Sequence, residues 1–192
     1  MVSLTDGEKL VALAKEAVFL SFDGKKPDLA NYSKYGTPQG VFVTLHKKGK
    51  LRGCVGFISP VYPLNVAIVK AAKAAAFEDT RFLPLEKKEL KDVEFEISVL
   101  TPPIKIVVKK PEEYIKKINL GKDGLIVKTS FTQGLLLPQV AHECGFDELE
   151  FLEATCEKAG LSRSAWKEFN IEVYKFQAII FKEQNGKVVK LK

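Results

Sequence analysis

Cys54 and Arg52 lie two residues apart in the segment Leu51-Arg52-Gly53-Cys54-Val55-Gly56. Residues two apart on a strand share one face, so the guanidinium can lower the pKa of the thiol and favour a nucleophile. The opposing interpretation is a small side chain buried under a helix, because free cysteine is among the most buried residue types. Gly53 and Gly56 weaken a strand, and they indicate a bulge or the close approach of another segment or a ligand.

Arginine is rare in this chain, which has Arg52, Arg81 and Arg163 among 30 basic residues. A sequence that otherwise uses lysine keeps the forked, bidentate cation at these three places. Arg81 stands in Asp79-Thr80-Arg81-Phe82, directly after an Ala-rich segment. There it can clamp a carboxylate or phosphate, bridge to Asp79, or cap the preceding helix.

Three further side chains are candidates for chemistry. Glu96, with Glu94 two residues before it, can form an acid and base pair, although charges on an exposed strand face are the commoner explanation. Gln139 and His142 share one side of a short helix at positions i and i+3. A single histidine is more often a surface or structural group than a catalyst. We therefore rank Glu96 and His142 below Cys54 as catalytic candidates.

The other cysteines do not form a recognisable site. Cys144 and Cys156 are predicted to be core residues, and an odd number of cysteines does not indicate a disulfide framework. A zinc site from His46, Cys54, His142 and Cys144 would have no familiar ligand spacing. The sequence also lacks a Gly-rich phosphate loop, a nucleophile elbow and a metalloprotease signature. We predict no metal and no cofactor.

Length, composition and charge indicate what class of protein the chain is. The chain has 192 residues, 46% of them apolar, and a net charge of +6, which is typical of a globular protein. Its lysines are scattered and do not form a stripe, so nucleic-acid binding is not favoured. No apolar run is long enough to span a membrane and no signal peptide is evident. We expect a soluble, cytoplasmic protein.

The spacing of apolar residues and turn formers predicts the elements that carry these side chains. A capping box from Thr5 to Glu8 should start a helix that ends near Ser21, followed by a surface loop to Gly40. The remaining helices are expected at 62–77, 111–118, 138–144 and 147–160. Strands are expected at 41–46, 51–58, 93–99, 104–108, 125–129 and 134–137, and a last strand or strand pair at 171–181. Long strands with helices inserted at intervals predict an α+β fold on an antiparallel sheet.

The first two strands should form a hairpin whose loop sets its register. A two-residue loop would force Lys48 to positive φ, so we predict a three-residue loop in which only Gly49 adopts it. This register pairs Phe42 with Cys54 and Thr44 with Arg52. It gathers a thiol, a guanidinium, a hydroxyl and the imidazole of His46 on one face.

The segment from Leu51 to Gly56 closely resembles the LRGCIG motif of the AMMECR family, with Val55 in place of isoleucine. Further matching blocks follow in the family's order, and the resemblance covers about residues 8–182. These blocks are Asp79-Thr80-Arg81-Phe82-Leu83-Pro84, Glu96-Ile97-Ser98-Val99-Leu100, Gly134 to Ala141, and Phe151 through Cys156 to Trp166.

The resemblance implies an α+β fold with two lobes and the motif near a cleft between them. We treat 1–192 as one domain of this kind. Gene neighbourhood in the family implies Memo-like and radical SAM proteins as partners, without naming a substrate.

Our leading hypothesis is that a cleft binds or processes a small anionic ligand. Arg52 or Arg81 would hold the anion, while Cys54 would act as nucleophile, ligand or close-packed floor, with Glu96 and His142 nearby. The ligand-binding set comprises Arg52, Gly53, Gly56, Arg81 and Gln139. The alternatives are a non-catalytic module that binds a partner protein and a nucleic-acid-binding regulator, so enzymatic activity stays undecided.

Overall fold

The structure is a computed structural model that describes residues 2–168 and 170–191. The chain separates into two compact units, the first formed by Met1–Leu100 and Ile179–Lys192 and the second by Thr101–Ala178. Each unit has its own sheet, and every strand pairing described is antiparallel. The predicted α+β class with antiparallel pairing is confirmed, but the strands divide between two sheets.

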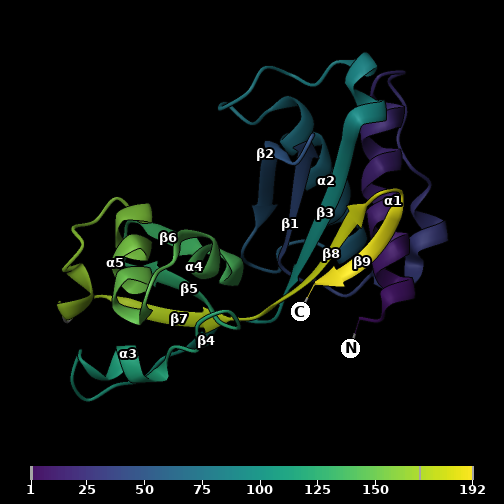
Figure 1. Ribbon diagram of the computed structural model, residues 1–192. Helices are drawn as coiled ribbons and strands as arrows, with labels where there is room; N and C mark the ends of the chain where they lie inside the picture. Colours follow the sequence, from purple (N-terminus) through teal and green to yellow (C-terminus); the bar gives the residue numbers. More distant parts are fainter. Residues whose placement is uncertain (1, 169, 192) are drawn as a thin grey trace. The chain divides into compact units, whose positions relative to one another are not determined.

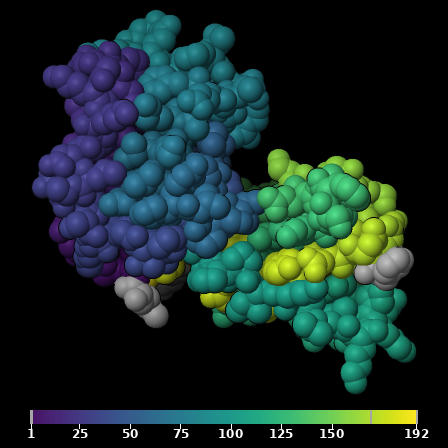
Figure 2. All heavy atoms as spheres, turned by 180° about the vertical axis from the view of Figure 1, so that it is seen from behind, coloured from purple at the N-terminus to yellow at the C-terminus, as the bar shows by residue number. Residues whose placement is uncertain are grey.

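The first unit contains a five-stranded sheet in the order β2-β1-β3-β8-β9, with α1 and α2 packed against it (Figure 1). Its elements are α1 (Leu4–Ser21), the 3-10 helix η1 (Leu29–Tyr35), β1 (Val41–Lys47), β2 (Lys50–Phe57), α2 (Leu64–Phe77), the 3-10 helix η2 (Lys87–Asp92), β3 (Val93–Leu100), β8 (Ala178–Gln184) and β9 (Lys187–Leu191). In the space-filling view of Figure 2, the purple and blue N-terminal residues form one face of this unit.

The cap of α1 lies one half-turn earlier than the sequence pattern predicts. The backbone N–H of Asp6 donates to the Ser3 hydroxyl at 3.1 Å, and the Ser3 N–H donates back to the Asp6 carboxylate at 3.0 Å. The capping box predicted from Thr5 to Glu8 is therefore wrong, because Ser3 and Asp6 have the same spacing and satisfy the first free donors. Tyr35 also donates to Asp6, at 2.9 Å, which ties η1 to the start of α1.

The first hairpin turns through two residues. Lys48 and Gly49 have φ angles of 51° and 75°, the left-handed values of a type I′ turn. The predicted three-residue loop is wrong because the type I′ turn matches the right-handed twist of the strands, and this match outweighs the strain at Lys48.

A β-bulge compensates for the shorter turn. Leu45 pairs with Gly53, whereas His46 pairs with Leu51, so Arg52 is the extra residue on β2. The bulge restores the alternation of the two faces beyond it. The predicted side-chain faces therefore survive from Gly53 onward although the predicted register does not.

Cys54 lies opposite Thr44, not opposite Phe42 as the predicted register required. Phe42 pairs with Gly56 instead. Phe42, Thr44 and Cys54 still share one face, as predicted, because a shift by two residues preserves the side on which a side chain lies.

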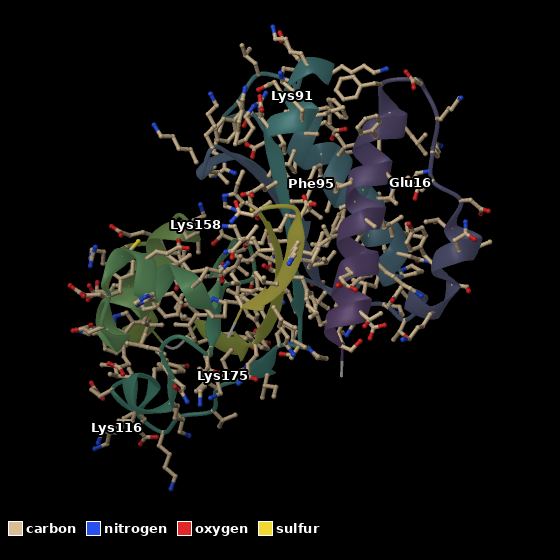
Figure 3. The ribbon with its side chains drawn as sticks, turned by 45° about the vertical axis from the view of Figure 1, so that its right-hand side comes forward. Glu16, Lys91, Phe95, Lys116, Lys158 and Lys175 are labelled. Atoms are coloured by element: carbon tan, nitrogen blue, oxygen red, sulfur yellow. The ribbon has the colours of Figure 1, made fainter. Side chains whose placement is uncertain are left out.

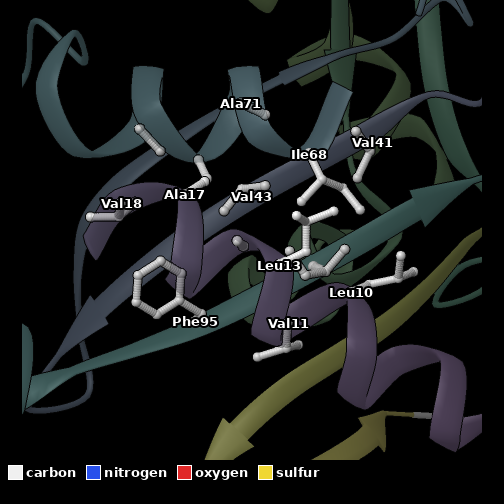
Figure 4. Close-up of a cluster of buried hydrophobic side chains, with 14 of the residues drawn as sticks. Leu10, Val11, Leu13, Ala17, Val18, Val41, Val43, Ile68, Ala71 and Phe95 are labelled. Carbon is white, nitrogen blue, oxygen red and sulfur yellow. The ribbon is translucent and has the colours of Figure 1, made fainter. Parts of the chain in front are cut away.

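The opposite face of this sheet forms the main core with α1 and α2. Figure 4 shows the side chains of both helices meeting those of β1 and β3. The fully buried members include Leu10, Leu13, Ala17, Val41, Val43, Leu45, Ile68, Ala71, Phe95 and Ile97. This apolar packing fixes which face of the sheet remains for polar side chains.

The second unit contains a four-stranded sheet in the order β4-β7-β5-β6. Its elements are β4 (Ile104–Lys105), α3 (Glu113–Lys117), β5 (Gly124–Lys128), β6 (Gln133–Leu136), α4 (Pro138–Cys144), α5 (Glu148–Lys158), the 3-10 helix η3 (Ala165–Lys167) and β7 (Glu172–Phe176). Cys156 is fully buried in its core, as predicted. The prediction that Cys144 is a core residue is wrong: it is exposed at the end of α4, where the chain turns away through the left-handed Gly145.

The strand or strand pair predicted at 171–181 is a pair, and its two strands belong to different sheets. Gln177 separates β7 of the second unit from β8 of the first, and β9 follows a turn at Asn185 and Gly186. Within the described residues, no helix is long and apolar enough to cross a membrane.

Candidate functional site

Three polar side chains form a row across the sheet of the first unit. Thr44 on β1 lies between Cys54 on β2 and Glu96 on β3, and each pair is in direct cross-strand register. This polar row lies on the face opposite the main core. It brings a thiol, a hydroxyl and a carboxylate onto one surface, because neighbouring strands place paired residues on the same side.

The thiol of Cys54 is partly buried, and the Thr44 hydroxyl donates to its sulfur at 3.2 Å. Burial raises the pKa of Cys54, and the Thr44 hydrogen bond and the charge of Arg81 offset this only in part. The thiol is therefore neutral at pH 7. The predicted activation of Cys54 by Arg52 is wrong, because Arg52 is engaged elsewhere.

The backbone of Cys54 is held by the loop that follows α2. Its N–H donates to Asp79 Oδ2 at 2.8 Å, and Arg81 Nη2 donates to its carbonyl oxygen at 3.2 Å. Arg81 also donates to both oxygens of Asp79, from Nε at 2.9 Å and from Nη2 at 2.7 Å. These bonds satisfy backbone groups at the edge strand of the sheet and fix the thiol in place. The hydrogen bond from Arg81 holds the pKa of Asp79 well below its usual range.

Arg52 binds a carboxylate of the protein itself. Its Nη2 and Nε donate to Glu89 on η2 at 3.0 and 3.2 Å, and Lys47 adds a third contact at 2.8 Å. The Arg52 hydrogen bonds lower the pKa of Glu89 to about 2. The guanidinium groups of Arg52 and Arg81 lie 5.9 and 5.6 Å from the centre of the Phe82 ring. The predicted anion clamp at Arg52 is thus occupied by an internal ion pair.

The other end of the polar row is also buried. Glu96 is 7% exposed, and its carboxylate lies 3.2 Å from His46 Nε2 and 3.8 Å from Lys182 Nζ. Lys182 supplies a cation near this carboxylate, and His46 supplies a ring nitrogen within hydrogen-bond distance. The predicted pairing of Glu96 with Glu94 holds as a shared face, since both align with β1 residues of one side.

Two glycines of the motif lie so close to neighbouring backbone that no side chain would fit at either position. A Cβ atom at Gly53 would lie 2.0 Å from the carbonyl oxygen of Ala75 on α2, and one at Gly56 would lie 2.3 Å from the carbonyl oxygen of Val41. The predicted close approach of another segment is confirmed. At both positions the neighbour is backbone, which cannot rotate away.

Buried polar atoms without a hydrogen-bond partner among the described residues include Ser98 Oγ and Gln139 Oε1. Ser98 follows Glu96 on the same side of β3 and is 1% exposed. Gln139 and the exposed His142 lie on α4 in the second unit. The predicted cleft that would join them to Cys54 stays a prediction.

Sequence reasoning missed three contributors. Glu89 had no motif to mark it, and Lys182 lies in a strand far along the chain. Ser98 was detectable, because it alternates with Glu96 and must share its face. The bridge from Arg81 to Asp79 was one of the expected alternatives and is confirmed.

Within residues 2–168 and 170–191, no group of three or more His, Cys, Asp or Glu side chains is placed to hold a metal ion. The zinc alternative built on His46, Cys54, His142 and Cys144 therefore has no support there. The site's chemistry is that of a neutral thiol, a buried carboxylate and an arginine locked to an aspartate.

Comparison with known proteins identifies the family of the chain. The AMMECR1 family profile matches residues 11–181. A protein of Methanothermobacter thermautotrophicus is 46% identical over 187 residues, covering 95% of this chain and 96% of its own. A protein of Aquifex aeolicus is 45% identical over 183 residues, covering 93% of each chain.

A solved structure is similar over the same extent. The crystal structure of an uncharacterised protein from Pyrococcus horikoshii superimposes with a TM-score of 0.91 at 43% identity, covering 96% of each chain. At this coverage the match extends over both units. The chain therefore belongs to the AMMECR1 family.

Proposed function

We propose that the polar row and its neighbours Arg81 and Ser98 form a binding site for a small anionic ligand. Arg81, not Arg52, is the cation that meets the ligand. Cys54 takes part as a neutral thiol, and no chemical step is assigned to it. The proposal is supported by three features of the site, taken in turn below.

Arg81 is fixed and still accessible. Two bonds to Asp79 and one to the Cys54 carbonyl orient the guanidinium, and its side chain is 52% exposed. Among the described residues no acceptor is recorded for Nη1, so two N–H donors are available to a carboxylate or phosphate. A preorganised arginine loses less freedom on binding than a mobile lysine.

Ser98 is the single observation that carries the proposal. Its hydroxyl is buried and has no partner in the described structure, although a buried polar group without one costs about 1–3 kcal/mol. Such a group is retained where a ligand or an ordered water completes it. Ser98 lies beside Glu96, at one end of the polar row.

The charge of the site favours a ligand with both an anionic group and a hydrogen-bond donor. Arg81 and Lys182 provide cations, while Glu96 and Asp79 provide carboxylates. A purely anionic ligand would be repelled by Glu96. A small hydroxy or amino acid satisfies both demands.

The test is a thermal-shift screen with malate, citrate, glutamate and inorganic phosphate at constant ionic strength. A ligand that binds only the folded state stabilises it by about 2.7 kcal/mol at a hundred times its Kd. We expect at least one of these compounds to raise the Tm of the wild-type protein. The increase should be lost in Arg81→Gln and reduced in Ser98→Ala.

Arg163→Gln is the matched control. Arg163 is also paired with carboxylates and is 53% exposed, but it lies in the second unit. It should leave the ligand-induced increase in Tm unchanged. Because Arg81→Gln can disturb the Asp79 loop that holds Cys54, Ser98→Ala is the deciding variant. Equal shifts in Ser98→Ala and wild type, or no shift with any compound, would refute the proposal.

A partner-protein segment is the second candidate occupant. Leu83, two residues from Arg81, is 84% exposed, so a partner segment that engaged Arg81 could also bury this apolar side chain. A Memo-like or radical SAM protein is the partner class to test. Leu83→Asp should then abolish co-purification with it and leave the anion response intact.

A further inference from the structure

A hollow of about 810 Å³ lies in the first unit and shares no lining residue with the polar row. The C-terminal half of α1, the β1–β2 turn, η2 with the start of β3, and the end of β8 with the β8–β9 turn form its walls. The ends of α1, β1 and η2 lie at the same, upper end of this unit in Figure 1, and Figure 3 shows Lys91 there. The volume is in the range of sites for small molecules and cofactors.

Cations from three separate segments, α1, the β1–β2 turn and η2, line this lysine hollow. The five lysines are Lys15, Lys48, Lys87, Lys88 and Lys91, and the three carboxylates are Asp92, Glu94 and Glu183. Two of the carboxylates are already engaged, since Glu183 accepts from Lys15 at 2.6 Å and Glu94 accepts the Asn185 N–H at 3.3 Å. Lys87 and Lys88 are paired with Asp23 and Glu86, which lie outside the lining, so the cations that an anion can recruit most readily are Lys48, Lys91 and the surface-paired Lys87.

The cations are available to a ligand. Lys87 pairs with Asp23 at the surface, where an exposed ion pair contributes little to stability and exchanges readily. Lys48 and Lys91 have no ion-pair partner among the described residues. A bound anion would therefore displace only weak surface pairs.

Lys48 occupies a position that its side chain does not favour. The β8–β9 turn has Asn185 and Gly186 at φ angles of 52° and 77°, the residue types that a type I′ turn prefers. The β1–β2 turn adopts the same conformation but has Lys48 where asparagine would be less strained. Strand twist accounts for the type of turn but not for lysine at this position, so the lysine side chain itself calls for a reason. Both turns line the hollow, so one serves as an internal reference for the other.

An aromatic ring completes the lining. Phe19 is 54% exposed and lies one turn after Lys15 on α1, so both face the same side of the helix. Leu90 and Val93 add apolar surface beside it. An exposed ring next to several ammonium groups matches a ligand with a flat base and a chain of phosphates.

We propose that the lysine hollow binds a nucleoside triphosphate, with its phosphates on Lys48, Lys87 and Lys91 and its base against Phe19. This site is independent of the polar row. The phosphate chain accounts for the convergence of cations, and the base accounts for the exposed ring. No reaction is assigned to the bound nucleotide.

The test is calorimetric titration with ATP, and separately with inorganic tripolyphosphate, at low ionic strength. Lys48→Asn should weaken both by about tenfold, because it removes one charge-assisted contact while giving the turn its preferred residue. Its Tm should be equal to or above that of wild type. Phe19→Ala should weaken ATP binding and leave tripolyphosphate binding unchanged.

Lys50→Gln is the matched control, because Lys50 is adjacent to the same turn and does not line the hollow. It should change neither affinity by more than about twofold. Equal weakening in Lys50→Gln and Lys48→Asn would refute the site, as would unchanged ATP affinity in Lys48→Asn. Tighter binding of an eight-residue oligothymidylate than of ATP, lost in the same variant, would assign the hollow to nucleic acid and refute the nucleotide.

Discussion

Replacing Gly53 with alanine tests whether the close approach of α2 fixes the position of Cys54. The added Cβ would lie 2.0 Å from the Ala75 carbonyl oxygen, whereas ordinary contact begins at 3.4 Å. The helix and β2 must therefore separate locally by roughly 1.4 Å, the difference between these two distances. The obstacle is backbone, so no side-chain rotation relieves it.

The expected loss of stability is about 3 kcal/mol, the upper end of the range for overpacked sites. For a chain of this size it corresponds to a decrease in Tm of about 6–12 °C. Because α2 leads directly into the Asp79 loop that holds Cys54, we also expect faster iodoacetamide labelling of Cys54 in the folded variant. Differential scanning calorimetry and mass spectrometry measure the two effects.

Gly36→Ala is the control, because Gly36 has φ of −78° and its Cβ would lie 3.3 Å from one backbone oxygen. It should lower the Tm by no more than about 2 °C. A Gly53→Ala protein that melts within 1 °C of wild type, with unchanged Cys54 labelling, would show that the contact with α2 does not constrain the motif.

Three further predictions concern the ionisable groups of the site. Iodoacetamide should label the exposed Cys144 before Cys54, and the apparent pKa of Cys54 should lie above the ordinary thiol value because burial raises it. Thr44→Val should raise the Cys54 pKa further, because it removes a hydrogen bond that lowers it; an unchanged pH profile would contradict the 3.2 Å contact. The Arg52 contact lowers the pKa of Glu89 from 4.5 to about 2, so its stabilisation is present above pH 4.5 and is lost as pH falls toward 2. Wild type should exceed Glu89→Gln by about 1–2 kcal/mol at pH 6, after allowance for solvent screening, and urea titrations should show this gap closing by pH 2.

Much of the fold follows from local pattern. Alternation from Val93 to Val99 identified β3 and its polar side, and Pro138 with Gly145 marked both ends of α4. The register of the first hairpin could not be predicted from local pattern. Strand twist favours a two-residue turn with Lys48 at positive φ, and the bulge at Arg52 then shifts the strand pairing by one residue. Sequence gives no direct measure of that balance between turn strain and strand twist.

The candidate site was likewise only partly predictable from the sequence. Cys54 and its face were predictable from a spacing of two residues, and the bridge from Arg81 to Asp79 was one open alternative. The partner of Arg52 was not predictable, because Glu89 lies on η2, distant in sequence and without a motif. Long-range ion pairs depend on tertiary packing, which no local pattern encodes.

The most direct test of the proposed site is to observe which amides respond to an anion. We would record ¹⁵N NMR spectra of the folded protein during titration with malate, citrate, glutamate and phosphate in turn. The proposed site predicts saturable shifts at Cys54, Arg81 and Ser98, and smaller shifts at these positions in Ser98→Ala. Shifts confined to exposed lysine turns, with Cys54, Arg81 and Ser98 unmoved by every compound, would contradict it.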